Sequence, residues 1–146
     1  MPEMPKVATW HLPVADLETA PYWDATKQGK LLIKECRSCG RAYFYPRNHC
    51  PRCWSTDTVW KEASGRGRVY TFTVVYQNDL PPFRDRLPYV VAIVELEEGV
   101  RMTSNIEGIT PEGVRCGLPV TVAFRDEQRG EDTIAIPVFR PAQPEA

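Results

Sequence analysis

The sequence predicts a mainly β fold that consists of a short N-terminal helix, a metal-binding ribbon and a small barrel of five strands. Two Cys-x-x-Cys pairs lie close together between residues 36 and 53, which is typical of a ribbon built around one ion. From residue 65 onward, β-forming side chains alternate with period two, with Val69 and Thr71 expected on one face and Tyr70 and Phe72 on the other, and no convincing helix separates the later strand candidates. We therefore expect one helix in front and strands behind it.

The length and composition are those of one globular domain. The chain has 146 residues, of which 42% are hydrophobic, and its formal net charge is −1. A chain of this length buries roughly 68–70% of its unfolded surface and needs no disulfide staples. The small net charge argues against a protein that mainly neutralises nucleic-acid phosphates or lies on an anionic membrane.

Residues 89–94 form the longest apolar run, far short of the roughly 20 residues of a membrane-spanning helix. The first residues lack the pattern of a secretory signal, so we expect a protein of the reducing cytoplasm.

Residues 1–30 predict an arm followed by a helix. Residues 1–18 contain three prolines and little periodicity, so we expect them to be extended. A helix is predicted with Thr19 as a candidate N-cap, Pro21 in its first turn, residues 22–28 as its body and Gly29 at the stop.

Residues 31–63 predict the ribbon and residues 64–141 the barrel. Short strands at residues 31–33 and 59–62 enclose the cysteines. The barrel strands are expected at residues 69–76, 89–97, 100–107, 118–125 and 132–139. Five strands without intervening helices favour closure into a barrel of the OB type, because closure hides the strand edges of an open sheet. The loop at residues 79–88 is expected to project, and residues 142–146 to fray.

The cysteine spacing is the strongest chemical signal in the chain. Cys36, Cys39, Cys50 and Cys53 form two pairs separated by ten residues. Each pair fits one tight turn that points both sulfurs at a single ion, and two such turns complete the tetrahedral thiolate set that zinc prefers. We predict a structural zinc site at these four residues. Iron, as in a rubredoxin-like electron carrier, is the rival metal, but the long barrel would be superfluous for a carrier.

The other candidate groups favour structural or solvated roles. His49 adjoins Cys50, but four sulfurs already fill the tetrahedron, so we expect His49 to lie behind the metal ligands or in solvent. Cys116 lacks an evident partner base, and we expect it to be unreactive. Three acidic residues near the tightest hairpin could suggest acid–base chemistry or magnesium, but the alternation favours a solvated strand end. These are Glu95, Glu97 and Glu98.

Basic residues outnumber acidic ones around the cysteines. Between residues 30 and 53 only Glu35 is acidic, whereas six residues are basic. They are Lys30, Lys34, Arg37, Arg41, Arg47 and Arg52. Two interpretations stay open: these cations offset the charge of a zinc–thiolate cluster, or some of the arginines bind an anionic ligand such as phosphate.

Taken together, these motifs resemble one known family. They are Pro21-Tyr22-Trp23, Gly29-Lys30-Leu31, Cys-x-x-Cys-Gly, Pro46-Arg47, Cys-Pro-x-Cys, the segments at residues 65–73, 88–92 and 95–99, and Pro137-Val138-Phe139-Arg140-Pro141. The pattern covers residues 19–141 and is similar to that of the DUF35 family. This resemblance implies an N-terminal helical segment, a rubredoxin-like zinc ribbon and an OB-fold. One departure is that a single proline precedes Arg47, where family members often have two.

The resemblance also implies a function. Related proteins or domains accompany thiolase-like enzymes, including ketothiolases and steroid side-chain aldolases, and some are fused to MaoC-like hydratases. We therefore expect a non-catalytic accessory subunit that docks on an acyl-CoA enzyme and helps to shape its CoA channel. The residues expected to contact CoA are Arg37, Arg41, Phe44, Tyr45 and Arg47.

Two other functions remain open at this point. OB barrels and zinc ribbons both bind single-stranded nucleic acids, and Tyr70, Phe72 and Tyr76 could stack bases. Against this, residues 54–146 contain ten basic and fourteen acidic residues, which makes nucleic acid an unlikely partner. The second is a free-standing acyl-CoA carrier. No base-equipped nucleophile or phosphate-binding glycine loop emerges, so catalysis by this chain alone is not expected.

Overall fold

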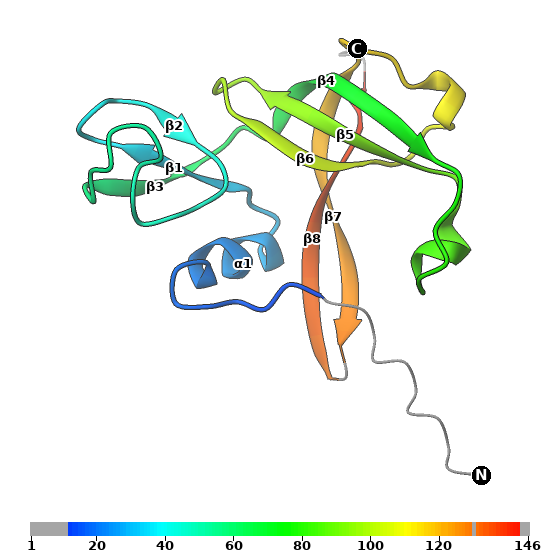
Figure 1. Cartoon of the computed structure of the whole chain (residues 1–146), viewed down its shortest axis with the longest axis horizontal. Helices are drawn as coiled ribbons and strands as arrows, with labels where there is room; N and C mark the ends of the chain where they lie inside the picture. The colour runs from blue at the N-terminus through cyan, green and yellow to red at the C-terminus, as the bar shows by residue number, and fades with distance from the viewer. Residues whose placement is uncertain (1–11, 130, 144–146) are drawn as a thin grey trace.

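A computed structural model describes residues 12–129 and 131–143 of the chain (Figure 1). One α-helix precedes a three-stranded ribbon sheet, and a closed barrel of five strands follows. The predicted mainly β fold is thus confirmed. No helix in the described ranges is long and apolar enough to cross a membrane.

Helix α1 (Ala20–Lys27) begins where the candidate N-cap predicted it and ends one residue before the predicted end of its body. Thr19 occupies the N-cap position, but its hydroxyl donates a hydrogen bond of 2.7 Å to Oδ1 of Asp16 and does not cap the helix. Gly29 has φ +75°, a left-handed conformation that suits glycine at a helix end. Tyr22 is only 3% exposed and belongs to the main core, so α1 is anchored by an aromatic ring.

The ribbon sheet has the order β2-β1-β3 and contains one strand that the sequence did not predict. Its strands are β1 (Leu32–Cys36), β2 (Ala42–Tyr43) and β3 (Thr58–Glu62). β2 has only two residues and pairs with Lys34 and Glu35 of β1. A period of two cannot be recognised over two residues, which explains why β2 was missed.

The barrel closes in the order β4-β5-β6-β8-β7. Its strands are β4 (Arg66–Val75), β5 (Tyr89–Leu96), β6 (Arg101–Ile106), β7 (Pro119–Arg129) and β8 (Asp132–Pro141). Two short 3-10 helices lie in its loops, at Phe83–Arg86 and Pro111–Gly113. Ile106 and Phe139 join β6 and β8 in parallel, and β4 pairs with β7 to complete the circle. Fully buried side chains, among them Val69, Val94 and Phe139, fill the interior.

A β-bulge in β4 changes the predicted alternation. The register with β5 shifts between Val69 and Thr71, which leaves Tyr70 as the extra residue. Val69 is buried, and Phe72 and Val74 also pack against the core, although a strict period of two would place them on opposite faces. The expectation that Val69 and Thr71 share one face and Tyr70 and Phe72 the other is therefore wrong, because the bulge shifts the pleat by one residue.

Glycine permits the tight entry of the chain into the barrel. Gly65 has φ +77°, and a Cβ there would lie 2.4 Å from Cγ1 of Val122. A Cβ on Gly67 would lie 2.5 Å from the backbone oxygen of Glu95. Both positions therefore require a residue without a side chain.

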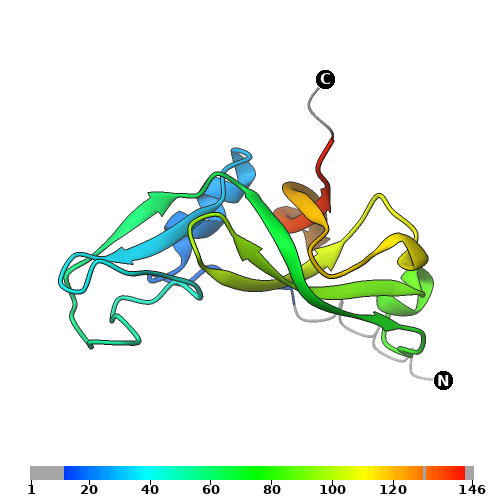
Figure 2. The same ribbon diagram turned by 90° about the horizontal axis from the view of Figure 1, so that it is seen from above.

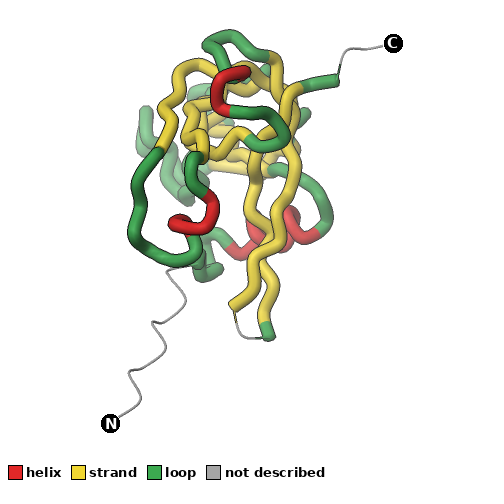
Figure 3. Tube along the Cα trace, turned by 90° about the vertical axis from the view of Figure 1, so that its right-hand side faces the viewer, coloured by secondary structure: helices red, strands yellow, loops and turns green. Residues whose placement is uncertain are grey.

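The β7–β8 hairpin is longer than predicted and extends beyond the barrel (Figures 1 and 3). β8 continues to Pro141, and the Ala142 N–H donates to the Pro119 carbonyl at 2.9 Å. Ile134 and Ala135, near the far end of the hairpin, are buried, and β8 lies against α1.

The ribbon and the barrel lie side by side and share one hydrophobic core (Figure 2). Tyr22 of α1 and Leu31 and Ile33 of the ribbon segment pack in the same cluster as Val69 and Val94 of the barrel. The ribbon is therefore held against the barrel by apolar burial.

Candidate metal centre and adjoining groove

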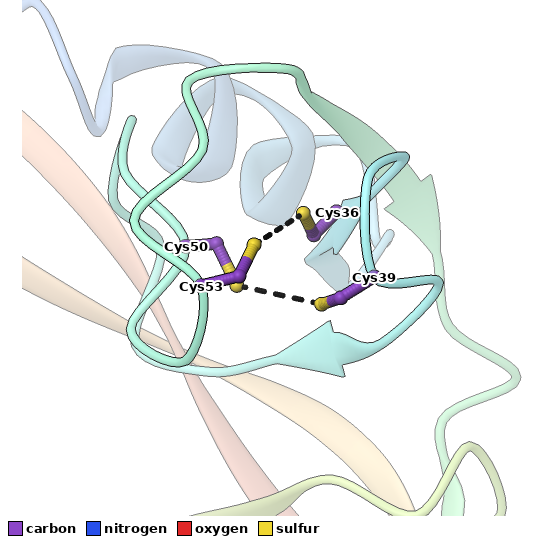
Figure 4. Close-up of side chains that lie close together, drawn as sticks. All are labelled: Cys36, Cys39, Cys50 and Cys53. Atoms are coloured by element: carbon purple, nitrogen blue, oxygen red, sulfur yellow. Dashed lines mark hydrogen bonds between the residues drawn. The ribbon is translucent and has the colours of Figure 1, made fainter.

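The four predicted cysteine ligands converge at one point (Figure 4). Cys36 ends β1 and Cys39 lies in the turn that follows, whereas Cys50 and Cys53 lie in the loop before β3. All four Sγ atoms lie within 4.8 Å of one another. Cys36 and Cys50 are buried, and Cys39 and Cys53 are exposed.

The sulfur positions fit a tetrahedral ion. The Sγ atoms of Cys36 and Cys53 are 3.6 Å apart, and those of Cys39 and Cys50 are 3.8 Å apart. A zinc–sulfur distance of about 2.3 Å corresponds to a sulfur–sulfur edge of about 3.8 Å in a regular tetrahedron. Disulfide bonds require about 2.05 Å, so these pairs are not disulfides. The donor set therefore fits a divalent metal such as zinc.

Each pair of cysteines lies in a turn, which we call the first knuckle (residues 36–40) and the second knuckle (residues 50–54). The N–H of Gly40 donates to the Cys36 carbonyl at 2.8 Å, and the N–H of Trp54 donates to the Cys50 carbonyl at 3.0 Å. The two turns thus repeat the same backbone hydrogen bond. This repetition explains why two separate segments present their sulfurs in the same way.

Backbone N–H groups favour the thiolate form at the first cysteine of each knuckle. The pKa of the Cys36 thiol is lowered, chiefly by a hydrogen bond from the Cys39 backbone. The pKa of Cys50 is lowered to about 7, chiefly by a hydrogen bond from the Cys53 backbone. Metal ligation requires thiolates, so these backbone donors assist binding at Cys36 and Cys50, whereas desolvation and the neighbouring thiols raise the pKa of Cys39 and Cys53.

Polar contacts fix the two knuckles to each other. The hydroxyls of Ser38 and Ser55 are 2.7 Å apart, and the Arg37 N–H donates to the Asp57 carbonyl at 2.9 Å. The Tyr43 hydroxyl donates to the Arg47 carbonyl, and its ring packs with Cys36 and Cys50.

An apolar groove of about 500 Å³ lies where α1, the ribbon and the barrel meet. Trp23, Phe44 and Tyr45 line the side formed by the helix and the ribbon. Met102 and Pro137 line the side formed by β6 and β8. The groove is the seam between ribbon and barrel, and aromatic rings contribute much of its wall.

Two of the five predicted CoA contacts line this groove, and a third lies beside one of them. Phe44 and Tyr45 line it, and the Arg47 guanidinium lies 5.7 Å from the centre of the half-exposed Tyr45 ring. Arg37 and Arg41 instead flank the first knuckle and are exposed. The structure thus brings Phe44, Tyr45 and Arg47 together and places Arg37 and Arg41 on a separate part of the ribbon.

The acidic residues of the tight hairpin are engaged with basic or backbone groups. Glu95 pairs with Arg101 at 2.8 Å, and Glu97 makes two hydrogen bonds to Arg66, of 3.1 and 3.0 Å. Oε1 of Glu98 accepts a hydrogen bond from the Ser64 N–H. The predicted solvated strand end is confirmed for Glu97, which lies on the surface. His49 and Cys116 are also exposed.

The aromatic residues considered for base stacking do not form one platform. Phe72 packs against the core, whereas Tyr76 is 73% exposed. Tyr70 lies under Arg101, whose guanidinium is 3.7 Å from the ring centre. The bulge at Tyr70 separates its ring from that of Phe72, and Tyr76 lies one residue beyond the end of β4.

Sequence reasoning missed two polar features that depend on tertiary contacts. Nζ of Lys34, a residue only 4% exposed, lies 4.5 Å from the centre of the Trp60 ring. Arg86, in the loop before β5, pairs with Glu127 of the long hairpin at 2.7 Å. Partners so distant in sequence leave no local signal. Arg86 also lines a second cavity, of about 370 Å³, at the far end of the barrel.

Comparison with known proteins yields two matching domain models. Residues 23–59 match the rubredoxin-like zinc ribbon domain of ChsH2, and residues 60–125 match the ChsH2 C-terminal OB-fold domain. The boundary between the two lies in β3, close to the predicted limit of the ribbon.

Several curated proteins are similar to this chain. A probable enoyl-CoA hydratase alpha subunit of Thermomonospora curvata is 38% identical over 91% of this chain and 40% of its own length. A DUF35 domain-containing scaffold protein of Methanocaldococcus jannaschii is 39% identical over 77% of this chain and 81% of its own length. The benzoylsuccinyl-CoA thiolase subunit BbsA of Geobacter metallireducens is 30% identical over 69% of this chain and 66% of its own length. The chain thus spans less than half of the hydratase subunit that it matches.

A solved structure has the same architecture. The structure described as Ltp2-ChsH2(DUF35) aldolase has a TM-score of 0.75 and 36% sequence identity, and the match covers 89% of this chain and 98% of the other.

Proposed function

Because the chain belongs to the DUF35 family, whose rubredoxin-like ribbon and OB-fold it contains, we propose that it is an accessory subunit of an acyl-CoA enzyme. Its partner is a catalytic subunit of the thiolase superfamily or, alternatively, a MaoC-like hydratase. The chain docks on that subunit and helps to shape the channel for CoA. It does not itself perform the reaction.

One observation carries the proposal. The match to the Ltp2-ChsH2(DUF35) aldolase structure spans 98% of that chain at 36% identity, so a DUF35 chain of nearly the same extent occurs together with an aldolase. The names of the similar proteins agree, since they describe a scaffold, a thiolase subunit and a hydratase subunit.

We infer that Cys36, Cys39, Cys50 and Cys53 bind one zinc ion. The sulfur–sulfur distances of 3.6 and 3.8 Å support this. Four protein ligands leave no open position for substrate, so the ion serves folding and not a reaction step. It fixes the two knuckles and thereby the surface of the ribbon.

We propose that the groove between ribbon and barrel takes part of the CoA molecule. Phe44 and Tyr45 offer aromatic faces to the adenine, and Arg47 offers a guanidinium to a phosphate. Arg37 and Arg41 remain predicted phosphate contacts on the exposed first knuckle. The catalytic subunit closes the open side of this groove in the complex.

Purification from the native host tests the accessory role. The tagged full chain is isolated, and its companions are identified by native mass spectrometry. The expected result is a heteromer with a thiolase-superfamily or MaoC-like chain, and that catalytic chain alone is expected to lose turnover or to precipitate. Full turnover by the catalytic chain alone would refute the proposal.

Substitutions at the groove test CoA binding within that complex. Tyr45→Ala and Arg47→Ala are each expected to raise KM for the acyl-CoA about tenfold with little change in kcat, because they remove ground-state binding. Arg115→Ala is the control, since Arg115 is exposed and does not line the groove. An unchanged KM in both groove variants would remove these residues from the CoA site.

A further inference from the structure

Trp54 is a large apolar side chain that the fold leaves outside. It directly follows the metal-binding candidate Cys53 and is 77% exposed. Burying a large aromatic ring is among the strongest apolar contributions that a single residue makes. Trp54 makes little of that contribution within this chain.

The backbone of Trp54 adopts a conformation that disfavours its own side chain. Its φ is +63°, the left-handed region, whereas Gly40 has φ +72° at the matching position of the first knuckle. Both residues donate their N–H to the carbonyl of the first cysteine in their knuckle. Glycine adopts this conformation without steric cost, whereas a residue with a Cβ adopts it only at a steric cost. Glycine at residue 54 would therefore stabilise this turn more than tryptophan does, as Gly40 does in the first knuckle.

The surroundings of Trp54 hold its backbone in place. Cys53 is a predicted metal ligand, and the Ser55 carbonyl accepts a hydrogen bond of 2.9 Å from the Cys50 N–H. The Ser55 hydroxyl in turn contacts Ser38 of the first knuckle. A protruding ring on a fixed backbone loses little conformational freedom when it binds, which is the property of an interface anchor.

The charge of the ribbon segment that carries Trp54 indicates the chemistry of its partner. The exposed charged side chains of residues 36–57 are basic with the exception of Asp57. They are Arg37, Arg41, Arg47 and Arg52. A complementary surface offers an apolar pocket for the indole and carboxylates around its rim.

We propose that Trp54 anchors the second knuckle in an apolar, acid-rimmed pocket on the catalytic subunit. This inference rests on the proposed accessory function and adds the contact through which the ribbon binds. A second copy of this chain fits less well, because two basic knuckles would repel each other. Single-stranded nucleic acid also fits less well, because it requires successive rings along a basic groove and this is one ring at the tip of a turn.

Trp54→Gly is the sharpest variant, because glycine suits φ +63° and should leave the ribbon intact. The full-length variant is expected to keep the metal content and thermal midpoint of the wild type. Its affinity for the catalytic subunit, measured by biolayer interferometry, is expected to fall at least about 30-fold. Trp54→Phe should recover part of the affinity. Tyr76→Ala, which removes another exposed ring in a different region, should leave the affinity unchanged.

The outcomes separate this inference from the function on which it rests. If the wild-type chain binds no catalytic subunit, the accessory function fails and the anchor fails with it. If the wild type binds and Trp54→Gly binds within threefold of it, only the anchor is refuted. The anchor is also refuted if Trp54→Gly abolishes self-association in analytical ultracentrifugation, or binding of a labelled single-stranded oligonucleotide, while binding to the catalytic subunit persists. Arg52→Glu should slow association with the catalytic subunit, and equal association rates at low salt would contradict the acidic rim.

Discussion

The guanidinium of Arg86 lies 2.7 Å from the carboxylate of Glu127 and joins the loop before β5 to the long β7–β8 hairpin. Arg125 approaches the same carboxylate at 2.8 Å and also pairs with Glu107 near the end of β6. The Glu127 side chain is only 11% exposed. One buried carboxylate thus connects segments that are about forty residues apart in sequence.

Glu127→Gln should lower the free energy of unfolding by about 2 kcal/mol at pH 7, because the Arg86 guanidinium loses its anionic partner and Arg125 keeps only Glu107. The measurement is urea denaturation. Glu97→Gln is the matched control, since the side chains of Glu97 and Arg66 are 51% and 64% exposed, and it should cost less than about 1 kcal/mol. Equal losses in the two variants would contradict a special role for the buried pair.

The effect of Glu127 should also depend on pH. Burial opposes ionisation of this carboxyl, but Arg86 and Arg125 outweigh it, so its pKa is lowered from the usual 4.5. The folded state therefore binds the proton less readily than the unfolded state, and the stabilisation is fully present above pH 4.5. As the pH falls through the lowered pKa, the stability difference between wild type and Glu127→Gln should shrink. A difference that stays constant down to pH 2.5 would count against this account.

Cys39→Ser should lose the metal and unfold the ribbon. Metal binding at four-ligand sites of this kind contributes on the order of 10 kcal/mol to folding, and the shared core would lose its support on the ribbon side. Elemental analysis should give about one zinc per wild-type chain and far less for the variant. Cys116→Ser is the control, because Cys116 lies outside the cluster; it should retain the metal and the thermal midpoint.

Gly67→Ala should destabilise the barrel by about 2 kcal/mol through overpacking. The new Cβ would lie 2.5 Å from the Glu95 backbone oxygen and 3.0 Å from Cγ1 of Val94, and the backbone cannot move without opening the β4–β5 ladder. Gly99→Ala separates this effect from backbone conformation, because Gly99 has φ +81° but nothing within 4 Å of the new Cβ. It should cost about 1 kcal/mol. If the two variants unfold at the same urea midpoint, the close approach of the new Cβ to the Glu95 backbone does not explain the loss of stability in Gly67→Ala.

Lys34→Met should remove the contribution of Lys34 to the pH dependence of the free energy of unfolding. Burial lowers the pKa of Lys34 from 10.5, and the nearby Glu18 opposes the shift. The unfolded state therefore binds the proton more readily, and the wild type should gain stability as the pH rises from the lowered pKa toward 10.5. Lys34→Met should lack that gain in thermal unfolding between pH 8 and 10.5. Lys61→Met serves as the control, since Lys61 is exposed on the neighbouring strand.

Much of the fold and the metal centre could be predicted because the signals are local. The spacing of Cys36, Cys39, Cys50 and Cys53 requires two turns, and the turns require the ribbon. Alternation in residues 89–97 and 100–107 predicted β5 and β6 to within about one residue at each end. The short strand β2 escaped because its pairing depends on β1 and not on its own two residues.

The sequence by itself determined the cluster of four cysteines, helix α1 and the number of barrel strands, because each depends on the chemistry or periodicity of residues near one another in the chain. Only the tertiary structure decided that Tyr70 is bulged, that Arg86 pairs with Glu127, and that the ribbon packs on the barrel to leave an aromatic groove. These features arise when distant segments exclude water from the same space, and the energy of that burial depends on the assembled shape and not on the order of residues.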